Sequence, residues 1–272
     1  MLKRIVTALV LIPLVLVGIF KLDQQFFAIA AAALCLVGAW EWAQFCKFKK
    51  VLHRIFYALT YLIPFYGVWV YKDNNAFIHA LLIISLLFWF CAFAWMYLYS
   101  TYSQKVDLSG MAKLAIGYIV LTPMWLALFS IQKVSPGMIL WLFLMVWGAD
   151  SGAYFVGRKF GKKKLAQKLS PKKTMEGVYG GIVTSAIVAV AGIFILKLEM
   201  DSMPYWIALA ALVVVFSIAG DLFESMLKRL VGIKDSGSIF PGHGGVLDRV
   251  DSLTSAAPVF FFGMLIINSM KA

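Results

Sequence analysis

Residues 81–95 read LLIISLLFWFCAFAW, an unbroken apolar run without a charged side chain. Strands of an outer-membrane barrel instead alternate apolar and polar residues over about ten positions. A helix that crosses a bilayer needs about 20 mostly apolar residues, and the flanking residues extend this run to that length. The stretch therefore predicts a membrane-spanning helix, and others like it predict a helical bundle.

The composition of the whole chain agrees with a membrane bundle. Of 272 residues, 62% are hydrophobic and 14% are charged, against roughly 45–50% and about 25% in soluble domains. A soluble fold of this size could not cover its core with so few polar residues, and a disordered chain would be far less apolar. Cys35, Cys46 and Cys91 lie in or beside apolar runs and form no C-x-x-C pair, which also excludes a disulfide scaffold.

The sequence predicts an all-α polytopic membrane protein with about nine transmembrane helices. The first apolar segment follows two charged residues, as in a signal peptide, but no small-x-small cleavage site follows directly. We therefore expect it to stay as an uncleaved helix. The predicted segments are 4–20, 25–46, 51–71, 76–99, 112–132, 137–157, 175–198, 204–227 and 252–270.

Basic residues are distributed unevenly between alternate connections. If the N-terminus is cytoplasmic, the inside segments carry 20 of the 25 lysines and arginines, and the outside keeps only Lys21, Lys72, Lys133, Lys197 and Lys271. The positive-inside rule then places the N-terminus in the cytoplasm and the C-terminus outside. The inside segments are the N-terminus and the loops near 47–54, 100–113, 158–173 and 221–251.

The two halves of the chain differ in polarity. Residues 1–135 have short loops and few charges within the membrane, so we interpret them as a structural region with oligomer and lipid contacts. Residues 136–272 contain most of the acidic residues and the two long polar loops, 158–173 and 221–251. We expect the chemistry in this second region.

One acidic residue falls inside an apolar segment, in the stretch WGADSGAY (147–154). A carboxylate at that depth costs several kcal/mol unless it is paired or faces a polar cavity. Asp150 therefore either makes a hydrogen bond between helices or has a functional role, and we favour the functional role. Gly148 and Gly152 form a G-x-x-x-G pair, which is typical of close helix packing.

The loop 158–173 has eight basic residues. Attraction to anionic lipid headgroups would explain its charge, but not the tail SPKKTMEG (170–177). We expect Ser170 to cap a helix that begins at Pro171. That helix would present free N–H groups, Lys172 and Lys173 to an anion.

The stretch 221–251 combines carboxylates with cations. Asp221, Glu224, Ser225 and Lys228 are spaced i, i+3, i+4 and i+7, so they share one helix face. Further acids follow a Gly/Pro-rich turn that leads into the last helix. Hard oxygen ligands beside basic side chains suit Mg²⁺ held with a polyphosphate, and the turn GHGG (242–245) lets backbone N–H groups approach a phosphate. The alternative is a solvated charged loop.

Several nucleotide and hydrolase motifs are absent from the sequence. It contains no P-loop, no dinucleotide-binding G-x-G-x-x-G and no G-x-S-x-G elbow. A hydrolase built on Ser225 and His243 is an alternative without such a motif to support it.

The stretch 225–251 resembles the signature of the phosphatidate cytidylyltransferases, also called CDP-diacylglycerol synthases. The shared pattern is S-x-x-K-R-x4-K-D-x5-P-G-H-G-G-x-x-D-R-x-D over 27 residues. Residues 170–177 and Asp150-Ser151 resemble other stretches of that family, and the length and helix number resemble its short bacterial form. The resemblance implies a membrane enzyme of phospholipid biosynthesis that transfers a cytidylyl group from CTP to phosphatidate, giving CDP-diacylglycerol and pyrophosphate. It also implies Mg²⁺ and a homodimer.

The resemblance and the residue types suggest a role for each candidate. Asp221 and Asp248 are expected to bind Mg²⁺, with Asp251, Glu224 and Asp150 as further candidates. The triphosphate and the lipid phosphate would be held by Lys228, Arg229, Lys234 and Arg249. The substrate site would be lined by Ser170, Lys172, Lys173, Thr174, Glu176, Ser225, Gly242, His243, Gly244 and Gly245.

Two other functions are weighed against this one. A CTP-dependent lipid kinase, such as a polyprenol kinase, resembles the family in its C-terminal part, but the complete H-G-G-x-x-D-R-x-D run argues against it. A transporter would need polar residues through the bilayer midplane, whereas the charges here gather at one side. The expected partners are CTP, phosphatidate and membrane lipids, with no nucleic acid. The expected location is the bacterial inner membrane, with the active site facing the cytoplasm.

Overall fold

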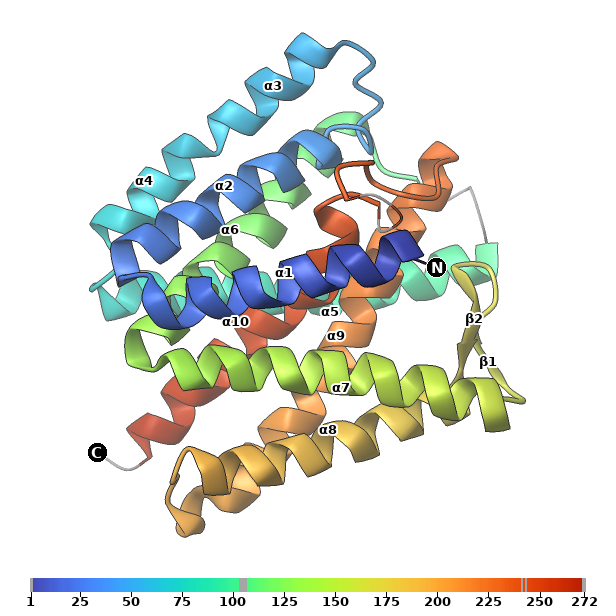
Figure 1. Cartoon of the computed structure of the whole chain (residues 1–272). Coiled ribbons are helices and arrows are strands. Elements are labelled where there is room, and N and C mark those ends of the chain that lie inside the picture. Colours follow the sequence, from blue (N-terminus) through green and yellow to red (C-terminus); the bar gives the residue numbers. More distant parts are fainter. Residues whose placement is uncertain (1, 103–106, 241, 243, 271–272) are drawn as a thin grey trace.

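The chain forms a bundle of long helices with one small β-hairpin at one end (Figure 1). The computed structural model describes residues 2–102, 107–240, 242 and 244–270. The elements are α1 (Leu2–Lys21), α2 (Gln24–Trp42), α3 (Val51–Thr60), α4 (Leu62–Val70), α5 (Asn75–Tyr102), α6 (Gly110–Val134), α7 (Pro136–Phe160), β1 (Lys164–Ala166), β2 (Ser170–Thr174), α8 (Met175–Ile195), the 3-10 helix η2 (Met200–Ser202), α9 (Met203–Val231) and α10 (Leu247–Ser269).

The helices confirm the predicted membrane fold. Within the described residues, eight segments are long and apolar enough to cross a bilayer. One of them, Val51–Val70, consists of α3 and α4 and breaks at Tyr61. Helix α1 adds a further apolar helix, whose apolar part Leu9–Lys21 is shorter. These elements match the nine predicted segments, and the fold is that of an all-α polytopic membrane protein.

Successive connections alternate between the two ends of the bundle. Near one end, Lys133 pairs with Asp73 at 2.8 Å. At the other end, Lys168 Nζ donates to the carbonyl of Thr101. Figure 1 shows the N-terminus at the hairpin end and the C-terminus at the opposite end. The alternation on which the orientation argument depends is therefore present in the fold.

Helix α9 is longer than a bilayer requires. Its 29 residues span about 43 Å at 1.5 Å per residue, against a hydrocarbon core of about 30 Å. Near its end, a Cβ on Gly220 would collide with the carbonyl oxygen of Asp251. The backbones of α9 and α10 therefore approach closely beside the first predicted site residue, Asp221.

Helices α7 and α8 also pack through glycines. A Cβ on Gly152 would meet the side chain of Thr184 and the carbonyl of Gly180, whereas one on Gly148 would lie 3.3 Å from Val188. The interpretation of Gly148 and Gly152 as a close-packing pair is therefore confirmed.

The tail of the basic loop is a strand instead of a helix start. Ser170–Thr174 forms β2, which pairs antiparallel with β1 in the register Ala166↔Ser170. The prediction that Ser170 caps a helix beginning at Pro171 is therefore wrong. Helix α8 begins at Met175, and its cap is Thr174, whose Oγ1 accepts from Gly177 N at 3.1 Å.

Two features of the sequence explain this later start. Thr174 is itself a favoured N-cap residue, and the side chain of Glu176 reaches back across the turn. Its oxygens accept hydrogen bonds from the backbone N–H groups of Lys162 and Lys163. The pair Thr174 and Glu176 thus fixes the junction between hairpin and helix.

Candidate active site

Lys228 joins the end of α9 to the start of α10. Its Nζ lies 2.7 Å from Oδ1 of Asp248 and 3.3 Å from Oε1 of Glu224. The three side chains are only 10%, 7% and 5% exposed, respectively. Because buried charges are retained where they are paired, these residues hold the two helix ends together. The prediction that the two helix ends bring carboxylates together is confirmed.

The second oxygen of Asp248 organises the α9–α10 loop, residues 232–246. Oδ2 accepts from the backbone N–H and the hydroxyl of Ser236, at 2.8 and 2.9 Å, and from the N–H of Gly245 at 2.8 Å. Asp248 therefore has a structural role toward the loop in addition to its ion pair. Its role as a Mg²⁺ ligand stays a prediction.

Asp221 forms an ion pair with the β1–β2 hairpin. Nζ of Lys173 on β2 lies 2.5 Å from Oδ2 of Asp221, and Ser225 Oγ lies 3.3 Å from Oδ1. Successive side chains of a strand point to opposite faces, and Lys172 is exposed. Of the two predicted lysines, Lys173 is therefore the one that the structure brings to the carboxylates.

The remaining predicted carboxylates belong to the same electrostatic cluster. Asp221 and Lys173 each interact electrostatically with two further carboxylates, Asp150 of α7 and Asp251 of α10. Glu224 in turn interacts electrostatically with Asp251 and with its ion-pair partner Lys228. We call this group, together with Asp248, the carboxylate cluster: it draws on α7, α9, α10 and the hairpin.

The cluster can be tested as a site for a divalent cation. In the part of the chain that the structure describes, no three His, Cys, Asp or Glu side chains are placed to hold a metal by themselves. Mg²⁺ in nucleotide enzymes, however, commonly takes one or two carboxylates and fills its shell with phosphate oxygens and water. Among the described residues, both carboxyl oxygens of Glu224 are buried without a hydrogen bond, and Oε1 has the ion-pair contact to Lys228 at 3.3 Å. The donor set therefore fits an ion shared with a phosphate.

Further predicted residues lie around the cluster in different settings. Arg229, Lys234 and Arg249 are exposed, and the charge of Arg249 reaches Asp150. Gly242 and Gly244 have φ angles of +76° and +84°, which L side chains rarely adopt. His243 is outside the described residues.

Three candidates for substrate contact also have structural roles. Thr174 and Glu176 hold the start of α8, and Ser170 pairs within the hairpin. The N–H of Gly245 is occupied by Asp248. Substrate contacts of these residues stay predictions.

Glu41 is a residue of this region that the sequence does not predict. This residue lies in the last turn of α2 with 0% exposure. Its carboxylate accepts hydrogen bonds from Ser236 Oγ, Val246 N and Leu247 N, at 3.0, 3.1 and 2.8 Å. The available signal was a lone acid between two tryptophans at the end of an apolar segment.

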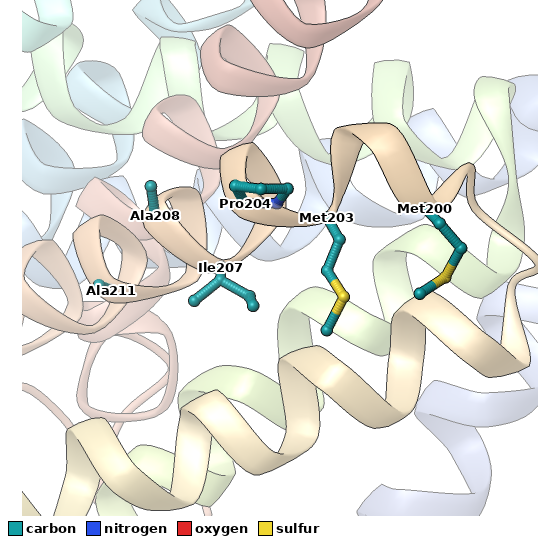
Figure 2. Close-up of a pocket in the computed structure, with 6 residues that line it drawn as sticks. All are labelled: Met200, Met203, Pro204, Ile207, Ala208 and Ala211. Carbon is teal, nitrogen blue, oxygen red and sulfur yellow. The ribbon is translucent and has the colours of Figure 1, made fainter.

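A groove of about 590 Å³ lies elsewhere, on η2 and the first turns of α9 (Figure 2). It has no charged residue in its lining, so it offers nothing to a triphosphate. The lining residues are Met200, Met203, Pro204, Ile207, Ala208 and Ala211.

Fold and site together define a polytopic membrane protein with a carboxylate–lysine cluster at one end of its helices. The chain matches the Cytidylyltransferase family over residues 2–267 and belongs to that family. It is 42% identical over 262 residues to the phosphatidate cytidylyltransferase of Pseudomonas aeruginosa, covering 95% of this chain and 94% of the relative. The phosphatidate cytidylyltransferase of Haemophilus influenzae is 36% identical over 280 residues, covering 96% and 97%. The resemblance inferred from residues 225–251 is confirmed.

Proposed function

We propose that this protein transfers the cytidylyl group of CTP to phosphatidate, forming CDP-diacylglycerol and pyrophosphate. The observation that carries the proposal is the similarity, over nearly the whole chain, to two phosphatidate cytidylyltransferases. The carboxylate cluster and the basic residues beside it support it, because they supply charges that a reaction between phosphates requires.

The reaction joins two polyanions. A phosphate oxygen of phosphatidate attacks the α-phosphorus of CTP. The bond from that phosphorus to the oxygen bridging to the β-phosphate breaks, and pyrophosphate leaves with the bonding electrons. Because the nucleophile is already an anion, the site needs no strong base. It must instead position the two phosphates and offset their repulsion.

The basic side chains divide into two groups for this task. Lys173 and Lys228 are paired with Asp221 and Asp248. They therefore place positive charge directly beside the carboxylates, where a phosphate would approach. Three others, Arg229, Lys234 and Arg249, are exposed and can reach the triphosphate and the lipid phosphate. Charge-assisted contacts of this kind are the strongest hydrogen bonds available to a phosphate.

We further propose that Asp221 and Asp248 bind Mg²⁺, with Asp150, Glu224 and Asp251 as supporting carboxylates. A lysine ammonium lies against each of the first two, at 2.5 and 2.7 Å. Each of these two carboxylates therefore already stabilises a positive charge beside it. When bound, Mg²⁺ would neutralise charge on the phosphates.

An apolar groove beside the α9–α10 loop suits the lipid substrate. It has a volume of about 320 Å³, and its lining includes Trp40 of α2, Ile55 and Leu59 of α3, and Ile239 of the loop. Arg54 lies over the Trp40 ring, 3.8 Å from its centroid. Acyl chains would thus find apolar surface, with a guanidinium at the edge for the headgroup.

We propose that the hairpin end of the bundle faces the cytoplasm of a bacterial cell, with the protein in the inner membrane. The excess of basic residues on the connections of that end supports this orientation. CTP would then reach the site directly. A homodimer, suggested by the family resemblance alone, is also proposed.

The activity can be tested with the purified protein in lipid micelles. Phosphatidate, Mg²⁺ and CTP labelled in the cytidine ring are expected to give a radioactive product that partitions into organic solvent. Chelation of Mg²⁺ should abolish its formation, and omission of phosphatidate should do the same. A wild-type protein that leaves all the label in the aqueous phase would contradict the proposed function.

A further inference from the structure

Glu41 and the α9–α10 loop come from opposite ends of the chain, yet they form one hydrogen-bonded unit. Both carboxylate oxygens of Glu41 accept: Oε1 from Val246 N, and Oε2 from Leu247 N and Ser236 Oγ. We infer that Glu41 is a positioning residue that fixes the α9–α10 loop for catalysis. This inference rests on the proposed function.

The environment explains how a carboxylate without exposed surface is accommodated. Buried charges are normally paired with a cation. The ion pairs of the described residues include none with Glu41, and Arg54 interacts with it only through longer-range electrostatics. Its donors Val246 and Leu247 instead belong to the start of α10. A helix N-terminus presents unpaired N–H groups and the positive end of the helix dipole, both of which favour an anion.

Ser236 extends the network from Glu41 toward the carboxylate cluster. Its hydroxyl lies 3.0 Å from Glu41 Oε2 and 2.9 Å from Asp248 Oδ2. A hydroxyl has one hydrogen, so the two carboxylates share this donor. Because Asp248 also binds Lys228, a continuous chain of polar contacts runs from α2 through the loop to α9.

The backbone of the α9–α10 loop passes close to the carboxylate of Glu41. A Cβ on Gly237 or on Gly245 would collide with the carboxyl group of Glu41. Gln44, on the turn after α2, donates to the carbonyl of Ser236 at 2.5 Å. The path of the loop is therefore set from α2, which lies in the half of the chain that the sequence predicts to be structural.

This placement bears on the chemistry because of what the loop carries. Lys234 and the glycines at 242, 244 and 245 lie on the loop, and Arg249 follows it on the first turn of α10. These residues are proposed to meet the phosphates. A loop released from Glu41 would hold them in many arrangements, of which few are productive.

Glu41→Gln tests the inference, since it keeps the size of the side chain but replaces one acceptor oxygen with a donor. We expect kcat to fall at least tenfold. A spin label on a cysteine at the exposed Ile239, in a protein whose other cysteines are replaced, should become more mobile. Glu41→Asp, which keeps both acceptors on a shorter chain, should recover part of kcat and part of the label's immobility.

The matched control is Gln132→Ala at the opposite end, where a buried side chain donates to Leu22 O. It should lower Tm while leaving kcat and the label unchanged. Should Glu41→Gln not fold, Ser236→Ala removes the shared hydroxyl and should reproduce both effects.

The outcomes separate the inference from the proposed function. A wild-type protein without cytidylyl transfer would refute the proposed function, while the label would still report on the loop. An active wild type with kcat of Glu41→Gln within twofold would overturn the inference. The inference would also be overturned if kcat fell only in proportion to Tm while the mobility of the spin label stayed unchanged.

Discussion

The ammonium nitrogen of Lys228 lies 2.7 Å from Oδ1 of Asp248, although the two residues belong to different helices. The contact joins the end of α9 to the start of α10 and leaves the other oxygen of Asp248 to hold the loop through Ser236 and Gly245. Among the residues that the structure describes, Asp221 has no comparable set of loop contacts; it contacts Lys173 and Ser225. The two proposed metal ligands should therefore respond differently to the same substitution.

We expect Asp221→Asn and Asp248→Asn both to lose nearly all cytidylyl transfer, because each removes a negative charge from the proposed Mg²⁺ site. Only Asp221→Asn should regain activity at high Mg²⁺ and keep a Tm near that of the wild type. Asp248→Asn leaves a buried lysine with a weaker partner, which costs several kcal/mol in comparable ion pairs, so its Tm should fall.

Titration of activity against Mg²⁺ and thermal unfolding measure the two effects. The double variant should be hardly worse than either single one, since residues that act as a unit are not additive. Near-normal turnover of either single variant at ordinary Mg²⁺ would remove that residue from the metal site.

Lys173→Gln should lower kcat/KM by tenfold or more. A charge-assisted contact is worth roughly 1.5–3 kcal/mol, and Lys173 is the hairpin lysine that reaches Asp221. Lys162→Gln is the matched control, because the structural contact of Lys162 to Glu176 uses its backbone N–H. Equal, mild effects of the two substitutions would instead indicate simple attraction of the loop to the membrane surface.

The sequence predicted the helices well because nearly every apolar run is long enough to cross a bilayer by itself. It also predicted the shared face of Asp221, Glu224 and Lys228, since helical spacing is a local property. It failed at Ser170 because Ser-Pro is a good helix start in isolation, and the pairing of 164–166 with 170–174 overrides that preference.

Glu41 was missed for a different reason. Its partner Ser236 lies 195 residues away in the sequence, and the local sequence of α2 does not predict a contact with that loop. The same holds for Lys173 and Asp221, whose pairing depends on how the hairpin docks on α9. The residues of the site were thus recognisable by type, whereas their partners depended on tertiary structure.

A cysteine at Ile239 should escape an impermeant maleimide added outside intact cells and react after the membrane is opened. Ile239 is 47% exposed, whereas Ser236 is 0% exposed and would be a poor reporter. Burial raises the pKa of the native Cys46 thiol to about 12, so its background reaction should be small. A cysteine at Met200, at the other end of α9, should react from outside; the reverse pattern would invert the proposed orientation.

Gly152→Ala should destabilise the α7–α8 pair by about 1–3 kcal/mol, the usual cost of overpacking. Its Cβ would meet Thr184 and the backbone of Gly180. Gly148→Ala on the same helix is the matched control, since its Cβ finds its nearest neighbour at 3.3 Å and needs only a small adjustment. Thermal unfolding in detergent should therefore show a clearly larger drop in Tm for Gly152→Ala.

The most direct test of the proposed function follows the two ends of the triphosphate separately. CTP labelled at the α-phosphate should transfer its label to the lipid product, and CTP labelled at the γ-phosphate should release its label as pyrophosphate. Phosphatidate is the acceptor in both reactions, with Mg²⁺ present. Appearance of the γ-label in the lipid, with the α-label left in CDP, would contradict cytidylyl transfer and identify the protein as a CTP-dependent lipid kinase.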